Sequence, residues 1–342
     1  MIQKSIDIRN ARCTSIINDE PKVNELDRFI FLFRGNTKIK GVRCKNVMFF
    51  PDCGLQVINN QIVPREAVFD DYALTIMQER HGGTNSGTAI ICESEIIKGD
   101  FCILSNCFSR NFAHWTEELF KVIVLEDYGF TGSYLVPDDP LYCREFMRLI
   151  GVPDERILGD RKKPTLFENV IYTTQVGHLD VLNYPEIVNA FREILFSACP
   201  DAFSLGDRLW LERKQLVRNT NRALVNEDEV YEVLQKHNVQ VVDFAEYSLC
   251  EQIAAARSMK VLSGPHGAAF VHSLFMDPNS TVLECFSPMH LNPSCIELYQ
   301  LLHHRYIQVV PTNTVYEPYP HGNRLELNIN HLKLVLENLD AF

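Results

Sequence analysis

Three ionisable side chains between residues 111 and 122 have the types and spacing for acid–base chemistry. Helical spacing places His114, Glu117 and Glu118 on one face together with Lys121, and the apolar residues of the segment on the other. Asn111 is a suitable N-cap for this helix. A histidine beside a carboxylate can act as a general base that the carboxylate orients. The alternative is a solvated helix face with ordinary charge pairs.

A second group of residues is basic and precedes an expected helix. Four cations lie within ten residues, at Arg213, Lys214, Arg218 and Arg222, in a chain of formal net charge -11. Such a loop can neutralise an anionic ligand, although a charge run of this kind is also common on a solvated surface. The next segment, Asn226 to Glu229, resembles a capping box, so we assign its acidic residues no catalytic role.

A third group lies between residues 260 and 285, where the pattern predicts a strand, a tight loop, a helix over 268–276 and a second strand. The order brings the N-terminus of a helix to the carboxyl edge of a parallel sheet, an arrangement that binds phosphate. Gly264 and Gly267 permit close approach or left-handed dihedral angles, and the helix begins at Ala268. His266 can donate to a phosphate or sugar oxygen, and Glu284 can accept from ribose hydroxyls. The alternative is a packed loop histidine and a surface carboxylate.

The elements that must position these groups form an α/β protein. The first hundred residues predict short strands and turns, and from residue 101 onward strands alternate with helices, as in βαβ units. The segment from Ser248 to Glu251 predicts a capping box, and residues 325–342 predict a helix. Residues 199–206 contain Pro, Gly and polar side chains and suggest a domain boundary. The expected strands lie near residues 133–136, 170–173, 208–212, 239–242, 260–262 and 281–285.

Composition restricts the protein class. The excess of acidic residues argues against nucleic-acid binding, and no apolar run has the length of a transmembrane segment. The N-terminal residues show no apolar signal region, so we expect a cytoplasmic protein. The eleven cysteines are scattered and odd in number, which predicts reduced, mostly buried thiols. Zinc-ligand spacing is absent from the sequence, and we expect no metal.

These motifs in this order resemble glycosyltransferase family 61, which includes plant xylosyltransferases, animal O-linked N-acetylglucosaminyltransferases and bacterial polysaccharide-biosynthesis enzymes. The resemblance extends over about residues 100 to 310. Its matching motifs are Asn111-Phe-Ala-His-Trp115, Arg213, Arg222-Ala-Leu-Val-Asn-Glu-Asp-Glu229, Glu251-Gln252, His266-Gly-Ala-Ala269 and Val282-Leu-Glu284.

The resemblance implies a GT-B fold, with two Rossmann-like domains facing a cleft, and inversion at the anomeric carbon without a metal. We expect an N-terminal acceptor-side domain over 1–204, β-rich over 1–100 and α/β over 101–204. A donor domain over 205–324 would bind a nucleotide sugar, most simply a UDP-sugar. The helix over 325–342 would cross back to the N-terminal half by analogy.

The expected reaction is sugar transfer to a hydroxyl of a glycan or glycoconjugate in polysaccharide biosynthesis. His114 is the candidate base, oriented by Glu117 or Glu118, either of which could instead act directly. Arg213, Arg218, Arg222 and the helix after Gly267 would neutralise the diphosphate. The sequence leaves open a homodimer and a peripheral place at the inner face of a membrane.

Two other classes of protein are alternatives to this hypothesis. An inactive nucleotide-sugar-binding or scaffold protein would keep the binding motifs without turnover. A nicotinamide-dependent dehydrogenase would need a Gly-x-Gly-x-x-Gly turn after the first strand of its sheet, and the sequence contains none.

Overall fold

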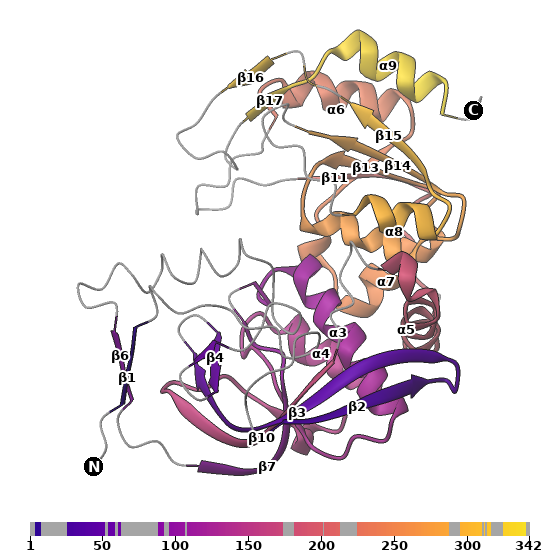
Figure 1. Ribbon diagram of the computed structural model, residues 1–342. Coiled ribbons are helices and arrows are strands. Elements are labelled where there is room, and N and C mark those ends of the chain that lie inside the picture. Colours follow the sequence, from indigo (N-terminus) through magenta and orange to yellow (C-terminus); the bar gives the residue numbers. More distant parts are fainter. Residues whose placement is uncertain are drawn as a thin grey trace. The chain divides into compact units, whose positions relative to one another are not determined.

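The fold is described from a computed structural model (Figure 1). Its described residues are 4–7, 26–51, 54–58, 61–62, 88–91, 96–106, 108–173, 181–200, 202–212, 224–286, 295–309, 311, 313–315 and 324–339. The chain divides into two compact units. Unit 1 comprises Met1–Gly177 and Glu186–Phe191, and unit 2 comprises His178–Pro185 and Arg192–Phe342.

Unit 1 is built on a mixed eight-stranded sheet of order β5-β4-β3-β10-β7-β8-β9, with β2 paired to β3. The pairs of β3 with β2, β4 and β10 are antiparallel, whereas β10, β7, β8 and β9 run parallel. A separate pair is β1 (Lys4–Asp7) with β6 (Thr88–Ile91). The sheet strands are β2 (Leu26–Phe33), β3 (Thr37–Phe50), β4 (Leu55–Ile58), β5 (Gln61–Ile62), β7 (Ile96–Ile103), β8 (Ser133–Leu135), β9 (Ile157–Leu158) and β10 (Thr165–Thr173).

The parallel part of this sheet is wound with helices. Strand β7 leads into α3 (Phe112–Asp127), and β8 leads through α4 (Tyr142–Ile150) and the 3₁₀ turn η1 (Asp154–Arg156) to β9. Helices α3 and α4 lie side by side (Figure 1). Side chains of the sheet strands, many of them β-branched or aromatic, form a buried apolar core. In this core the Phe167 ring is edge-on to the rings of Phe49 and Phe101. This core holds β7 rigidly, and with it the start of the loop before α3.

Unit 2 contains a parallel five-stranded sheet of order β12-β11-β13-β14-β15. Its strands are β11 (Arg208–Leu211), β12 (Gln240–Val242), β13 (Val261–Pro265), β14 (Thr281–Cys285) and β15 (Arg305–Val309). A small antiparallel pair joins β16 (Asn313–Val315) to β17 (Arg324–Glu326). The helices are η2 (Val181–Asn183), α5 (Pro185–Ala198), which both units share, α6 (Glu227–Lys236), η3 (Phe244–Glu246), α7 (Leu249–Ser258), η4 (Ala268–Phe275), α8 (Ile296–Leu301) and α9 (Ile329–Glu337).

Helices cover both faces of the parallel sheet in unit 2. Helices α6 and α9 lie together over one face, and α7 and α8 lie over the other (Figure 1). Side chains alternate along a strand, so Leu283 and Cys285 of β14 face the α6 side, where they join the apolar core, and Glu284 faces the α8 side. The Glu284 carboxylate is therefore buried on the face of the sheet that α8 covers.

The predicted strands near residues 133–136, 170–173, 208–212, 239–242, 260–262 and 281–285 are all confirmed. The capping box is confirmed at Ser248, but the one predicted at Asn226 is wrong. The Asn226 side chain instead bonds both the N–H and the C=O of Leu327 at 3.0 and 2.9 Å. A long-range backbone partner has replaced the local cap.

The C-terminal segment differs from its prediction. Strand β17 occupies Arg324–Glu326, and the helix begins only at Ile329. Leu332 and Leu336 of α9 pack into the apolar core with Val233 of α6. The described part of this segment, 324–339, therefore contributes to the apolar core of unit 2. The expected crossing to the N-terminal half stays a prediction.

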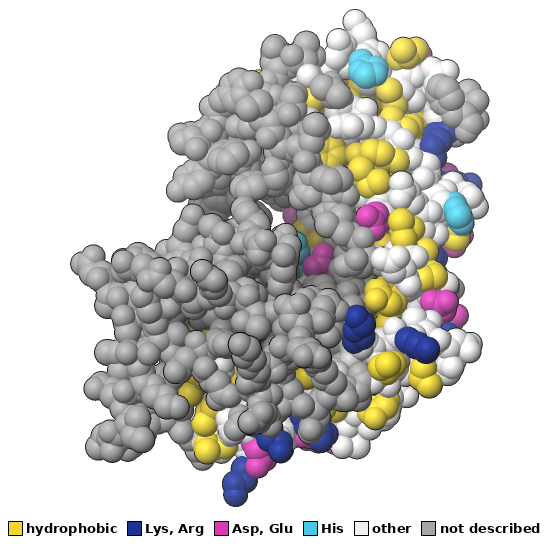
Figure 2. Space-filling model, viewed as in Figure 1, with side chains coloured by type: hydrophobic (Ala, Val, Ile, Leu, Met, Phe, Trp, Pro, Cys, Tyr) yellow, Lys and Arg dark blue, Asp and Glu magenta, His cyan; other side chains and the backbone are white. Residues whose placement is uncertain are grey.

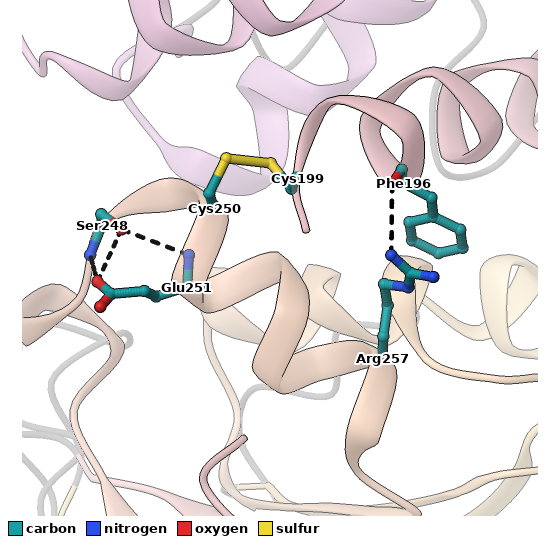
Figure 3. Close-up of a disulfide and its surroundings, with 6 residues drawn as sticks. All are labelled: Phe196, Cys199, Ser248, Cys250, Glu251 and Arg257. Atoms are coloured by element: carbon teal, nitrogen blue, oxygen red, sulfur yellow. Dashed lines mark hydrogen bonds between the residues drawn. A yellow bond between two sulfur atoms is a disulfide. The ribbon is translucent and has the colours of Figure 1, made fainter. Parts of the chain in front are cut away.

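The prediction that the cysteines are reduced is wrong for one pair. Cys199, at the end of α5, and Cys250, near the start of α7, form a disulfide (Figure 3). Further along α7, the Arg257 guanidinium lies 4.3 Å from the ring centroid of Phe196 on α5. The Ser204 and Ser258 hydroxyls are 2.9 Å apart. The chain around the end of α5 is thus fixed to α7 at three points.

The outer surface carries charges of both signs. On the face shown in Figure 2, described acidic and basic side chains are interspersed with apolar ones. Within the described ranges, no helix combines the length and the apolar character that spanning a bilayer requires.

Candidate active site

The first candidate group lies at the start of α3 in unit 1. Asn111 caps this helix, because its side chain accepts from the Ala113 N–H at 3.0 Å. One turn into the helix, Nδ1 of His114 is 3.4 Å from Oε2 of Glu117. The His114 side chain is 37% exposed and that of Glu117 is 10% exposed. A partly exposed ring with a carboxylate at its Nδ1 is the arrangement of an oriented general base.

The rest of the polar face of α3 is buried, which contradicts the alternative of a solvated face. The Glu118 and Lys121 side chains are only 1% and 5% exposed, and Oε2 of Glu118 is 2.8 Å from Nζ of Lys121. Oε1 of Glu118 accepts from Nδ2 of Asn106 at 3.1 Å. Burial raises the pKa of Glu118, and the Lys121 ammonium opposes that effect. Glu118 thus points away from solvent, unlike His114.

The loop before α3 leaves the carboxyl edge of the parallel strands. The Asn106 side chain turns it, since Oδ1 accepts from the N–H groups of Phe108 and Ser109 at 2.8 and 2.9 Å. The Phe108 ring then lies with its centroid 5.4 Å from that of His114. Ser105 donates to Asp160, as does Arg110 at 2.5 Å. Both ends of the loop are therefore tied to one carboxylate.

The second candidate group lies at the carboxyl edge of the unit 2 sheet. His266 follows β13, and its Nδ1 is 2.5 Å from Oε1 of Glu284, near the end of β14. The other oxygen of Glu284 accepts from the Tyr299 hydroxyl at 3.3 Å. The His266 ring stacks on Phe286, with centroids 4.4 Å apart. Both members of the pair are buried, which fixes the histidine ring more firmly than that of His114.

The two glycines near His266 behave differently. Gly264 has φ +143°, and a Cβ there would lie 2.9 Å from the carbonyl oxygen of Leu211, so the close approach predicted for it is confirmed. Gly267 has φ 179°, an extended conformation open to any residue, so no left-handed turn occurs there. Ala268 begins the predicted helix, which is 3₁₀ rather than α-helical.

A buried histidine fastens this loop to α7. Nδ1 of His272 lies 2.8 Å from the Ala269 carbonyl oxygen and Nε2 lies 3.0 Å from Oε1 of Gln252, and a neutral ring donates to only one of these two oxygens. Its ring also lies against that of Phe244, with centroids 4.3 Å apart. Burial lowers the pKa of His272 to about 4, so the ring is neutral at pH 7. Helix α7 therefore contributes to the position of the residues after His266.

The basic loop falls outside the described residues, and with it Arg213, Arg218 and Arg222. The residue before it, Glu212, directly follows β11, and its carboxylate lies 3.4 Å from the Tyr231 hydroxyl. Tyr231 also donates to Glu227 at 2.9 Å.

The family comparison covers the histidines of both candidate groups. The family model described as Glycosyltransferase 61 matches residues 112–283, about half of the chain. The chain belongs to glycosyltransferase family 61. No curated protein matches it. The family match begins at the first residue of α3 and ends one residue before Glu284, so it includes His114, Glu117 and His266.

Sequence reasoning found both histidines of this family 61 protein but not all of their surroundings. Asn106 was missed, although an Asn three residues before a Ser is a pattern that side-chain turns use. Tyr299 and Phe286 were also missed, and no local signal marks them, because only the fold brings them to Glu284 and His266.

Proposed function

We propose that this family 61 member is an inverting glycosyltransferase that moves a sugar from a UDP-sugar to a hydroxyl of a glycan. The observation that carries the proposal is the His114–Glu117 pair: a partly exposed imidazole with a carboxylate 3.4 Å from Nδ1, within the segment that matches the family. Family membership implies sugar transfer. The inverting chemistry, the donor and a role in polysaccharide synthesis are the proposal.

In the proposed step, Nε2 of His114 takes the proton of the acceptor hydroxyl as the hydroxyl oxygen attacks the anomeric carbon. The bond from that carbon to the diphosphate oxygen breaks, and UDP leaves with its electron pair. Glu117 stabilises the imidazolium that forms. Glu118 is a weaker candidate for the base than the sequence suggested, because its side chain is 1% exposed and paired with Lys121.

We place the donor at the carboxyl edge of the unit 2 sheet, where His266 would donate to the diphosphate. Glu284 supports this role, since its Oε1 lies at Nδ1: a doubly protonated ring would donate to Glu284 through Nδ1 and to the diphosphate through Nε2. The ribose contact predicted for Glu284 stays a prediction, and its oxygens already accept from His266 and Tyr299. Gly264 and the backbone from Gly267 to Ala268 would border the same site.

We propose a GT-B arrangement, with an acceptor-side domain over 1–204 and a donor domain over 205–324. The parallel sheet of unit 2, with helices on both faces, supports the second of these. Arg213, Arg218 and Arg222 would neutralise the leaving diphosphate in place of a metal. Arg213 directly follows Glu212, the residue after β11.

The Cys199–Cys250 disulfide bears on the compartment. The sequence favoured the cytoplasm, but disulfides persist mainly in oxidising compartments. We therefore propose that the protein works in an oxidising environment. Alkylation of the denatured, unreduced protein should label at least two thiols fewer than alkylation after reduction. Equal labelling would contradict this assignment.

The function is tested by thermal shift with UDP and a panel of UDP-sugars, with and without EDTA, followed by donor hydrolysis for every ligand that binds. A ligand at about 100 times its Kd stabilises the folded protein by about 2.7 kcal/mol. We expect binding in EDTA, its loss in Arg213→Ala, and binding without turnover in His114→Ala.

Matched controls separate site effects from general ones. Arg148→Ala removes an arginine that pairs with Asp154, and His331→Ala removes an exposed histidine of α9. Both should behave as wild type. Binding without turnover in the wild type, with glycan acceptors present, would favour an inactive nucleotide-sugar-binding protein. No binding of any nucleotide would overturn the donor site.

A further inference from the structure

A charged pair is buried behind the helix that carries His114. Glu118 and Lys121 are 2.8 Å apart with side chains 1% and 5% exposed. A buried ion pair contributes little net stability, because desolvation offsets the attraction, and a well-packed apolar pair is often as stable. Stability alone therefore gives a poor account of these two residues, and their other contacts are informative.

The second contact of Glu118 is the side-chain amide of Asn106. That amide has a donor end and an acceptor end, and the turn before α3 needs the acceptor end, because Oδ1 of Asn106 receives the N–H groups of Phe108 and Ser109. An ionised carboxylate can only accept, so at 3.1 Å it selects the donor end, Nδ2, which also has a longer contact of 3.4 Å with the Leu104 carbonyl oxygen. A protonated Glu118 could donate and would tolerate the reversed amide. Lys121 favours the ionised form.

The turn that Asn106 forms also places the Phe108 ring against His114, the candidate base. The Phe108 centroid is 5.4 Å from that of His114, and Ser109 closes the turn through bonds of 2.9 and 3.0 Å with the Asn106 backbone. The path from the buried charges to the imidazole is thus a continuous series of hydrogen bonds and one ring contact.

We propose that Glu118, Lys121 and Asn106 are positioning residues: the ion pair helps to fix the orientation of the Asn106 amide, which holds Phe108 and Ser109 and, through Phe108, the ring of His114. None of the three touches substrate in this assignment. Its catalytic consequence rests on the proposed function, but the positioning itself can be measured without an assay for sugar transfer.

Two double variants provide a matched test. Glu118→Gln/Lys121→Met removes both charges and keeps an oxygen that can accept from Asn106, whereas Glu118→Leu/Lys121→Met removes both charges and the acceptor. Neither strands a buried charge, so both should fold, as thermal melting would verify. Phe108→Leu provides a reference for loss of the ring contact.

The first readout is the Hε1 and Cε1 NMR signal of His114, assigned by its loss in His114→Gln. We expect the Gln/Met variant to keep the wild-type signal and the Leu/Met variant to shift it in the direction that Phe108→Leu does. An unshifted signal in the Leu/Met variant would overturn the proposal. If either double variant does not fold, Asn106→Ala, which leaves the ion pair intact, should produce the same shift, and an unshifted signal there would overturn it equally.

The second readout is kinetic and uses a UDP-sugar that the wild type turns over. Misplacement of a catalytic group can reduce rates by up to about a hundredfold, so the Leu/Met variant should lose about tenfold or more in kcat at unchanged donor KM, and the Gln/Met variant should not. Equal loss in both variants would show that the charge, rather than the amide orientation, matters, and would overturn the mechanism. A shifted His114 signal in a protein that turns over no donor would support the positioning and contradict the proposed function.

Discussion

The two histidine–carboxylate pairs of this protein are built in opposite ways. His114 and Glu117 come from one turn of α3, 3.4 Å apart, with the imidazole 37% exposed. His266 and Glu284 come from the ends of two neighbouring strands, 2.5 Å apart, with side chains 9% and 2% exposed. The first pair depends on helix spacing alone, and the second depends on the register of β13 with β14, in which Gly264 is opposite Glu284.

The difference fits the division of labour that we propose for the two pairs. A base that must take and release a proton needs access to a hydroxyl and a partner that tolerates both states, which suits the exposed pair on α3. A histidine that donates a hydrogen bond to a bound anion benefits from a ring held in one orientation, which suits the buried pair.

The largest expected effect separates the two histidines by function. His114→Asn should lower kcat by about 10²- to 10⁴-fold, the usual contribution of a general base, with donor affinity unchanged. His266→Asn should weaken donor binding instead. Steady-state kinetics and direct UDP titration distinguish the two effects, with His331→Asn as the surface control. Loss of donor affinity in both variants would contradict the assignment of different roles to His114 and His266.

A third histidine, His272, sharpens the comparison, because its ring nitrogens contact a backbone carbonyl oxygen and a side-chain amide oxygen rather than a carboxylate. The folded pKa of His272 is about 4, below its ordinary 6.5. Below pH 6.5 the His272 ring is protonated in the unfolded chain, whereas in the folded chain it stays neutral until the pH approaches 4. The free energy of unfolding should therefore fall as the pH drops from 6.5 towards 4, by about 3 kcal/mol in total.

Chemical denaturation at several pH values measures this slope. His272→Leu removes this titrating group and should flatten the profile between pH 6.5 and 4. Burial also lowers the pKa of His304, which contributes to the same slope, so the variant must be compared with wild type. Parallel profiles for the two proteins would mean that His272 is protonated in the folded state.

The smallest expected effect compares the carboxylates. Glu284→Gln replaces a buried acceptor of His266 and Tyr299 and should cost about 1.5–3 kcal/mol of unfolding free energy, the range for hydrogen bonds to charged groups. Glu117→Gln changes a pair whose histidine is partly solvated and should cost less than about 1 kcal/mol. Urea denaturation of both variants decides the point. Equal costs would show that burial does not distinguish the two pairs.

Local patterns predicted structure well where no distant group competed. Two segments carried the signature of a capping box, and Ser248 forms it, because its hydroxyl and the Glu251 carboxylate find their partners within four residues. Asn226 has an equivalent sequence but is bonded to Leu327, 101 residues away. Nothing in the local sequence distinguishes these outcomes, since only the folded chain brings Leu327 to Asn226.

The candidate site shows the same limit. The sequence placed His114, Glu117, Glu118 and Lys121 on one helix face, and α3 confirms the spacing. It could not show that Glu118 and Lys121 are buried, because polarity predicts exposure unless a partner such as Asn106 is known. His266 and Glu284 were found from strand order, which also placed both at the carboxyl edge of the sheet.

The link between α5 and α7 has a practical consequence. Cys199 and Cys250 are separated by 51 residues, so their covalent bond closes a long loop. A preparation in which only some molecules carry the bond is a mixture of two covalent species, even if every molecule is folded. Their unfolded forms differ in conformational freedom, so melting curves of such a mixture would be broadened. The choice of expression host and of reductant would then determine the composition of the sample before any experiment begins.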